Sequence, residues 1–356
     1  MLLEGIFPAI TTPFYPNGDL YLRKLEHNVA RYSRTQLAGM VVLGSTGEAV
    51  MLSLEEQREI LKIAIAAAAP DKVMIAGVGQ ESVRHTMAMA EHAAALDYDA
   101  VLVRTPFFYR GQFHRATAPQ LEMLTYYRAI ADHSPLPVLL YSVPVFTQYD
   151  LPMEVIAELA QHPNIIGIKD SSGQPQRIAE IAAATQSIRR SVTVTPVFAA
   201  VTRRMMPAQS DNSEEKFVAA DALGKAGTSV AVAAPAAMKT RQKEIGFSVL
   251  TGGAGTLHRA LNAGANGAIL AFAACAPQCC YETWTAWKEG DQALAEEKQQ
   301  RIGRASQRVT AEMGIPGLKF ACDLNGYFGG SPRLPFLPLT ADLQREVQTL
   351  MSDIRY

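Results

Sequence analysis

The segment IIGIKDSSG, residues 165–173, places a lysine at the end of an apolar run. Lys169 follows residues typical of a buried strand and comes directly before an acid, two hydroxyls and a glycine. A lysine at a strand end is usually solvated, but enclosure in a pocket would favour the neutral amine, which attacks carbonyl carbons. Lys169 is therefore a candidate nucleophile for Schiff-base formation.

A tyrosine ends the apolar run that precedes the one carrying Lys169. Tyr141 lies in the segment PVLLYSVP, where Pro144 stiffens the following turn. If the two runs are adjacent parallel strands, their ends lie about 4.8 Å apart. The Tyr141 hydroxyl could then pass a proton to and from a carbinolamine oxygen. The structural alternative is an ordinary core tyrosine whose hydroxyl finds a partner.

Two glycine-containing segments end other apolar runs. In GSTGE, residues 44–48, the glycines permit a tight turn whose backbone N–H groups and hydroxyls would face an anion. A carboxylate or a phosphate would fit, and a plain structural turn is the alternative. Gly252 and Gly253 permit either close approach of a ligand or close packing.

Each of these motifs lies at the end of a short apolar run. Such runs recur along the chain and alternate with longer helix-like runs. The expected strands are residues 7–12, 39–43, 73–78, 100–105, 138–141, 165–169, 247–251 and 267–271. Continuous Val/Ile/Leu runs are typical of parallel strands covered on both faces. Ser53 and Glu56 form a capping box before one of the helices. The pattern predicts a (β/α)8 TIM barrel with its active site at the mouth, and an open doubly wound sheet is the rival.

The spacing of the runs also predicts the domain organisation. Residues 1–273 form the barrel, and residues 274–356 form a C-terminal extension of additional helices. The interval after Lys169 is longer than one βα unit requires. We therefore expect an insertion at about residues 187–246, between the sixth helix and the seventh strand, on the face opposite the mouth.

Composition restricts the classes of partner. The 356-residue chain has a formal net charge of −1, so its overall charge does not attract nucleic acid or an anionic membrane. Its apolar runs are too short to span a bilayer, and its first residues do not resemble a signal peptide. The four cysteines suit a cytoplasmic protein, and no histidine run completes a zinc pattern with them. We expect no nucleic-acid partner, no membrane partner and no metal.

Taken in order, GSTGE, TPFFYRG, YSVP, GIKDSSG and TGGAG resemble the dihydrodipicolinate synthase/N-acetylneuraminate lyase family of class I aldolases. Within it, YSVP, QHPNIIGIKDSSG and GIPGLKFACDLNGYFGG are most similar to 4-hydroxy-2-oxoglutarate aldolase. The resemblance implies a TIM barrel, a homo-oligomer (a dimer or, as is usual in the family, a tetramer), a small 2-oxo acid as substrate, and neither a metal nor an organic cofactor.

The resemblance also implies roles for individual residues. Lys169 would form the imine with pyruvate or another 2-oxo acid, and Tyr141 and Ser45 would carry protons. Thr46 would hold the substrate carboxylate. Ser171 would contact the distal part of the substrate, and Gly252 would lie beside the imine.

Two positions depart from the family pattern. Phe108 stands where a tyrosine of the family reaches into the relay of a neighbouring subunit, so the relay needs Tyr109 or water instead. Phe146 stands where dihydrodipicolinate synthases carry an arginine for the carboxylate of the second substrate. A phenyl ring cannot replace that bidentate contact.

The sequence therefore predicts a Schiff-base aldolase or lyase that forms pyruvate or glyoxylate from a 2-oxo acid. Alternatives within the same chemistry are dihydrodipicolinate synthase and a keto-deoxy sugar acid aldolase or dehydratase. A non-catalytic 2-oxo-acid binding protein is the alternative from a different class, and Phe108 favours it. A metal-dependent aldolase is a third possibility, for which the strand ends offer no His/carboxylate cluster.

Overall fold

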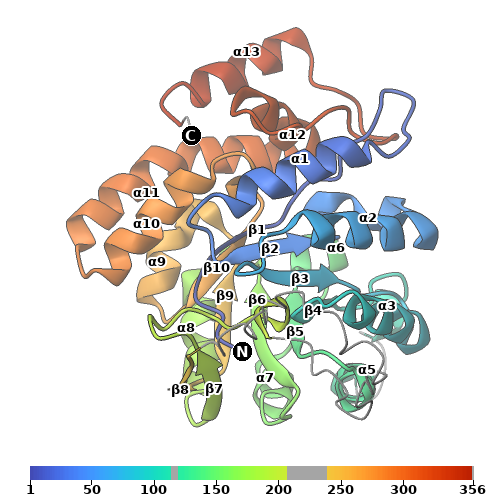
Figure 1. Cartoon of the computed structure of the whole chain (residues 1–356), viewed down its shortest axis with the longest axis vertical. Helices are drawn as coiled ribbons and strands as arrows, with labels where there is room; N and C mark the ends of the chain where they lie inside the picture. The colour runs from blue at the N-terminus through green and yellow to red at the C-terminus, as the bar shows by residue number, and fades with distance from the viewer. Residues whose placement is uncertain (114–118, 207–238, 355–356) are drawn as a thin grey trace, which may run out of the picture.

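The computed structural model describes residues 1–113, 119–206 and 239–354. Its centre is a sheet of eight parallel strands in the order β1-β10-β9-β6-β5-β4-β3-β2 (Figure 1). The Ile10 amide donates to the Val41 carbonyl at 3.0 Å and joins the two ends of the sheet. The predicted (β/α)8 barrel is confirmed. Its strands are β1 (Gly5–Pro8), β2 (Gly39–Val42), β3 (Val73–Gly77), β4 (Ala100–Arg104), β5 (Val138–Ser142), β6 (Ile165–Asp170), β9 (Ser248–Thr251) and β10 (Gly267–Leu270).

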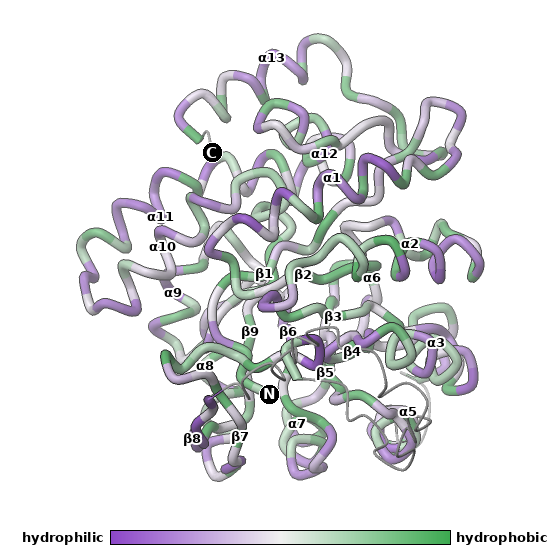
Figure 2. The backbone as a smooth tube through the Cα atoms, in the orientation of Figure 1, coloured by the Kyte–Doolittle hydropathy of each residue, from purple (hydrophilic) through white to green (hydrophobic). Residues whose placement is uncertain are grey.

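Helices surround the strands, and Figure 2 shows hydrophobic residues along the central strands and hydrophilic ones on outer helices such as α11 and α13. The predicted capping box begins α2, where the Glu56 amide donates to Ser53 Oγ and the Ser53 amide to Glu56 Oε2. No helix in the described ranges is long and apolar enough to cross a membrane. The barrel helices are α1 (Leu22–Ser33), α2 (Leu54–Ala67), α3 (Val83–Ala95), α4 (Arg110–Phe113), α5 (Pro119–His133), α6 (Pro144–Thr147), α7 (Met153–Leu159), α8 (Pro175–Ala184) and α9 (Leu257–Asn262).

The predicted C-terminal helices pack against one side of the barrel. In Figure 1, α12 lies beside α1 and α13 lies on the far side of α12, and the Asn28 side chain donates to the Phe328 carbonyl at 2.8 Å. The end of the chain thus reaches the side of the barrel formed by its first elements. These helices are α10 (Pro277–Lys288), α11 (Gln292–Ser306), the π-helical turn Gln307–Glu312, α12 (Gly314–Leu324) and α13 (Ala341–Leu350).

Between β6 and β9 the chain leaves the barrel. β7 (Arg190–Val194) and β8 (Arg241–Ile245) pair antiparallel in a separate two-stranded sheet. Arg190 donates to the Ile165 carbonyl at 2.6 Å, and the Arg203 amide donates to Asp99 at 2.7 Å. These contacts lie where β6 and β4 begin, at the N-terminal end of the barrel. Residues 207–238, most of the expected insertion, lie outside the described residues, and the predicted domain boundaries stay a prediction.

Candidate active site

Tyr141 and Lys169 lie side by side at the C-terminal ends of neighbouring strands. β5 and β6 pair them directly in register, and the Lys169 ammonium lies 4.2 Å from the centroid of the Tyr141 ring. Both residues are only 5% exposed. The neighbouring Asp170 is ion-paired with Arg177 at 2.8 Å, and no ion pair joins Lys169 to a carboxylate among the described residues. The lysine therefore has a phenol, and not a carboxylate, as its polar neighbour.

The Tyr141 hydroxyl lies among groups that favour its ionised form. Its oxygen is 3.4 Å from the hydroxyl oxygen of Ser45. Burial alone would raise the pKa of Tyr141, but the charge of Lys169 and interactions with Ser45, Lys169 and Ser171 outweigh burial and lower it. A phenol with a lowered pKa gives up and recovers a proton more easily near neutral pH. The site can therefore exchange a proton between an amine and a phenol.

Ser171 and Gly252 lie on the other side of this pair. The Ser171 amide donates to the Ser142 carbonyl at 2.9 Å, and the Gly252 amide donates to the Asp170 carbonyl at 2.7 Å. A Cβ atom on Gly252 would lie 2.0 Å from the Ser171 hydroxyl oxygen, so no larger residue fits there. Close packing against Ser171 thus explains this glycine.

Thr46 is the predicted site residue that is least connected to the others. It lies in the 3-10 turn Ser45–Gly47 after β2 and is 7% exposed. Within the described residues, no hydrogen bond joins its hydroxyl to Lys169 or Tyr141. The structure thus gathers Lys169, Tyr141, Ser45, Ser171 and Gly252, and leaves Thr46 next to them in the chain.

A buried ion pair anchors the GSTGE turn to the C-terminal helices. Glu48 ends the turn in the left-handed conformation, with φ 55°. Its carboxylate contacts the Lys319 ammonium at 2.6 Å, and its other oxygen accepts the Arg333 amide at 2.9 Å. The side chains of Glu48 and Lys319 are 0% and 1% exposed. Burial lowers the pKa of Lys319, and the Glu48 carboxylate opposes this shift.

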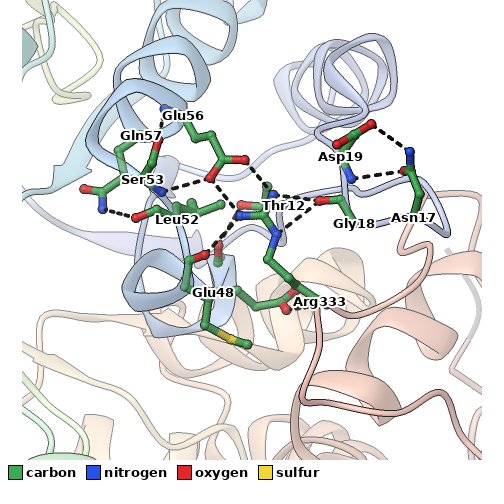
Figure 3. Close-up of polar contacts among 12 residues, drawn as sticks. Thr12, Asn17, Gly18, Asp19, Glu48, Leu52, Ser53, Glu56, Gln57 and Arg333 are labelled. Carbon is green, nitrogen blue, oxygen red and sulfur yellow. Dashed lines mark hydrogen bonds and ion pairs between the residues drawn. The ribbon is translucent and has the colours of Figure 1, made fainter.

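Arg333 strengthens the same anchor through further contacts with its side chain (Figure 3). Its guanidinium donates to the Gly18 carbonyl at 2.6 Å and to the Met51 carbonyl at 3.0 Å, and it is ion-paired with Glu56 at 2.5 Å. Our sequence reasoning missed both Lys319 and Arg333. The signal for Lys319 was a lone lysine in the apolar run GLKFACDL, the same kind of signal that drew attention to Lys169.

The two phenylalanines that depart from the family pattern lie on the exposed rim of the mouth. Phe108 is 69% exposed and Phe146 is 63% exposed. Tyr109 is 56% exposed and packs edge-to-face on Phe108, with ring centroids 5.1 Å apart. In the described part of the chain, no hydrogen bond connects Tyr109 to Tyr141 or Ser45. Within this subunit, Tyr109 does not replace the missing relay tyrosine.

A small open pocket, with a volume of about 40 Å³, borders Tyr141 and Ser45 on the side of β3 and β4. Gln80 and Arg104 also line it. Sequence reasoning placed Gln80 at a strand end in the mouth and missed Arg104. The alternation of side chains along β4 could have identified Arg104. Ala100 and Leu102 belong to the cluster that fills the barrel interior, so Arg104 points the same way.

None of the four cysteines lines the pocket beside Tyr141. All four are buried and free, and burial raises the pKa of the thiols of Cys275 and Cys280. The described residues include no group of three or more His, Cys, Asp or Glu side chains placed to hold a metal ion. Buried thiols with raised pKa values are unreactive, which favours a packing role for them.

Similarity to known proteins covers most of the chain. The model of the dihydrodipicolinate synthetase family matches residues 2–192 and 228–354. A 4-hydroxy-tetrahydrodipicolinate synthase from Xanthomonas campestris is 38% identical over 183 residues, which are 51% of this chain and 58% of that relative. This match therefore spans little more than half the length of the relative.

Two further matches extend over the full length. An L-threo-3-deoxy-hexylosonate aldolase from Aspergillus niger is 26% identical over 358 residues, covering 99% of this chain and 95% of that one. The crystal structure of a chloride-inhibited dihydrodipicolinate synthase from Acinetobacter baumannii in complex with pyruvate superposes with a TM-score of 0.76 at 25% identity, covering 99% of each chain. Because the family model matches far more than half of its residues, the chain belongs to the dihydrodipicolinate synthetase family, whose members use a lysine Schiff base for lyase and aldolase chemistry.

Proposed function

We propose that the chain is a class I aldolase that cleaves a 2-oxo acid through an imine on Lys169. The observation that carries this proposal is the contact between Lys169 and Tyr141, in which a nearly buried amine has a phenol with a lowered pKa as its polar neighbour. Proton transfer from the ammonium to the phenolate leaves a neutral amine, which can attack a carbonyl. Ser45 is placed to pass that proton onward.

The reaction would proceed in balanced steps. The Lys169 nitrogen attacks C2 of the substrate, and the carbinolamine oxygen takes a proton from Tyr141 and leaves as water. The electrons of the C3–C4 bond then move into the protonated imine as that bond breaks, while the C4 hydroxyl gives its proton to the Tyr141 phenolate and becomes a carbonyl. The enamine that remains takes that proton from Tyr141 at C3, and water hydrolyses the resulting imine and releases pyruvate from Lys169.

For the substrate we propose 4-hydroxy-2-oxoglutarate, whose cleavage yields pyruvate and glyoxylate. The motifs YSVP, QHPNIIGIKDSSG and GIPGLKFACDLNGYFGG support this choice. The exposed Phe146 argues against dihydrodipicolinate synthesis, because a phenyl ring offers the second substrate no bidentate contact. The relative from Aspergillus niger supports a keto-deoxy sugar acid as the second candidate substrate.

Borohydride reduction in the presence of pyruvate tests the chemistry. We expect a pyruvate adduct on Lys169, identified by mass spectrometry of the digested protein. An unmodified Lys169 in folded protein would rule out the imine. A panel with 4-hydroxy-2-oxoglutarate, keto-deoxy sugar acids, N-acetylneuraminate, and pyruvate plus aspartate semialdehyde then identifies the substrate.

The exposed rim supports two further points. Phe108 cannot carry a proton, which favours a binding protein that has lost turnover as the alternative function. Rapid exchange of the pyruvate methyl protons with deuterated water would exclude that alternative.

We also propose that the chain assembles into a homo-oligomer, because Phe108, Val145 and Phe146 expose apolar surface on one rim. Sedimentation velocity would show its size.

A further inference from the structure

The mouth contains a cation that the imine chemistry does not use. Of the described residues that line the cavity beside Tyr141, Arg104 is the one with a charged side chain. The remainder of the lining consists of apolar side chains, glycines and the polar groups of Ser45, Gln80 and Tyr141. A single fixed charge in a mostly apolar cavity is a common way to orient a small charged ligand.

The fold directs Arg104 into this cavity and leaves room for it. Arg104 is in register with Tyr141, as Tyr141 is with Lys169, so the three residues end consecutive strands. A Cβ atom on Gly79 would lie 2.5 Å from the Arg104 nitrogen and 2.9 Å from its Cγ. A larger residue in place of Gly79 would therefore displace Arg104, both its backbone and the start of its side chain.

One edge of the guanidinium is already held by the protein. Arg104 Nη1 donates to Glu81 at 2.8 Å and to the Thr105 carbonyl at 3.2 Å, and the guanidinium lies 4.7 Å from the Phe107 ring centroid. Glu81 in turn accepts the amides of Phe107 and Phe108 at 3.0 and 2.9 Å. These contacts order the side chain before any ligand arrives.

The other edge of the guanidinium is open. Nε and Nη2 of Arg104 donate to no acceptor within the described ranges, although an arginine carries five N–H donors in a rigid fork. Arg104 is also only 14% exposed in its side chain, so bulk water screens it weakly. A pre-ordered, partly desolvated fork with a free edge matches the two oxygens of a carboxylate.

We propose that Arg104 binds the distal carboxylate of a five-carbon 2-oxo dicarboxylic acid whose C2 is attached to Lys169. This inference rests on the proposed imine function and specifies its substrate class. Two strand spacings separate Lys169 from Arg104, on the order of 10 Å between backbones. Two long side chains and the three bonds between C2 and C5 of the substrate span that distance. Arg104 then supplies the charge recognition that Phe146 lacks.

A matched pair of uncleavable ligands tests this assignment without depending on turnover. 2-Oxoglutarate and 2-oxopentanoate have the same chain length and differ in the distal carboxylate. We expect borohydride trapping of wild-type protein to reach half-saturation at a much lower concentration of 2-oxoglutarate. In Arg104→Gln this preference should fall by about 100-fold, the cost of losing a bidentate charged contact. Arg104→Lys should recover part of the preference.

Controls separate this role from a structural one. Trapping of pyruvate, which has no distal carboxylate, should be unchanged in Arg104→Gln, and Arg84→Gln on the exposed surface of α3 should behave as wild type. Equal losses with pyruvate and 2-oxoglutarate would mean that Arg104 only supports the loop, and would overturn the proposal. Wild-type protein that traps pyruvate but does not prefer 2-oxoglutarate would overturn it and leave the imine chemistry intact. Absence of any adduct would overturn both.

Discussion

Two lysines of this chain are buried beside aromatic rings, Lys169 at the end of β6 and Lys319 in α12. They are 5% and 1% exposed, and their ammonium groups lie 4.2 and 4.4 Å from the ring centroids of Tyr141 and Phe14. Lys319 contacts the Glu48 carboxylate at 2.6 Å and donates to the Ser331 carbonyl at 2.9 Å. Lys169 has the Tyr141 phenol instead. Burial and an aromatic neighbour are common to both lysines, so neither feature distinguishes a nucleophile.

The partner of each lysine makes the difference. A carboxylate stabilises the ammonium form of Lys319 and holds it in one place, so Lys319 serves as a structural cation. The phenolate form of Tyr141, which the lowered pKa favours, can take a proton from an ammonium and return it, which an ion-paired carboxylate does far less readily. The contrast predicts that mutation of one lysine removes chemistry and that mutation of the other removes stability.

The largest expected effect is on Lys169. Lys169→Met should abolish the borohydride adduct with pyruvate and lower kcat by at least about 10⁴-fold, because no other group forms the imine. Its midpoint of denaturation should stay close to that of wild type. Lys62→Met, at an exposed position of α2, is the matched control. An adduct that persists in Lys169→Met would place the nucleophile elsewhere and break the comparison.

Lys319→Met should act on the free energy of unfolding. Removing the ammonium leaves the Glu48 carboxylate buried without its ion-pair partner, which costs about 3–5 kcal/mol. Denaturant unfolding measures this loss. The double variant Lys319→Met with Glu48→Gln should recover much of it, because the unpaired charge is gone. If Lys319→Met unfolds like wild type but loses the pyruvate adduct, the division of roles between the two lysines is wrong.

Tyr141→Phe tests the comparison of the two lysines in a second way, because it removes the hydroxyl partner of Lys169 and leaves Lys169 itself in place. Loss of the proton carrier should reduce kcat by about 10²- to 10⁴-fold. Slow trapping of pyruvate on Lys169 should remain, since the amine is still present. Undiminished turnover would show that another group, or water, carries the proton.

The titration of Tyr141 gives a test in the absence of substrate. Burial would raise the pKa of this phenol, but the charge of Lys169 and the nearby hydrogen bonds outweigh burial and lower it. The phenol should therefore be half-ionised at a pH below 10, the ordinary pKa of tyrosine. The wild-type minus Tyr141→Phe difference in absorbance near 295 nm measures this. In Lys169→Met the positive charge is absent, so the pKa should rise. A midpoint that does not move would mean that Lys169 does not act on Tyr141.

The smallest effect is expected for the Ser45 hydroxyl. Its contact with Tyr141 is long, at 3.4 Å, and water can take its place in a relay. Ser45→Ala should therefore lower kcat by only about 10-fold, less than the roughly 10²- to 10⁴-fold effects of general acid–base groups. Ser187→Ala, at an exposed position after α8, is the control. A loss as large as that of Tyr141→Phe would make Ser45 an obligatory proton carrier.

The barrel could be predicted because local patterns determine it. Seven of the eight expected strands begin and end within one residue of the observed ones, since continuous apolar runs mark strands buried on both faces. The first strand differs, since its ladder ends at Pro8 and only the isolated bridge of Ala9 with Val41 continues it. Family membership was likewise predicted from motifs and is confirmed.

Long-range pairings could not be predicted in this way. The partners Glu48 and Lys319 belong to segments far apart in the sequence, and no local pattern indicates which distant carboxylate a lone lysine meets. β8 reads RQKEI, without the apolar alternation of a half-buried strand, and its residues are exposed or only partly buried where it pairs with β7. Arg104, by contrast, could have been predicted. Side chains alternate along a strand, so Arg104 points into the barrel in the same direction as Ala100 and Leu102.

The anchoring of the GSTGE turn has a consequence for the order in which the molecule is made. Glu48 and Arg333 are 285 residues apart, so at a synthesis rate of about 5–20 residues per second the turn waits on the order of ten seconds to a minute for its partners. Lys169 and Tyr141 leave the ribosome well before then. A nascent chain that stops short of Lys319 thus carries the reactive lysine and its phenol beside a turn that nothing yet holds in place.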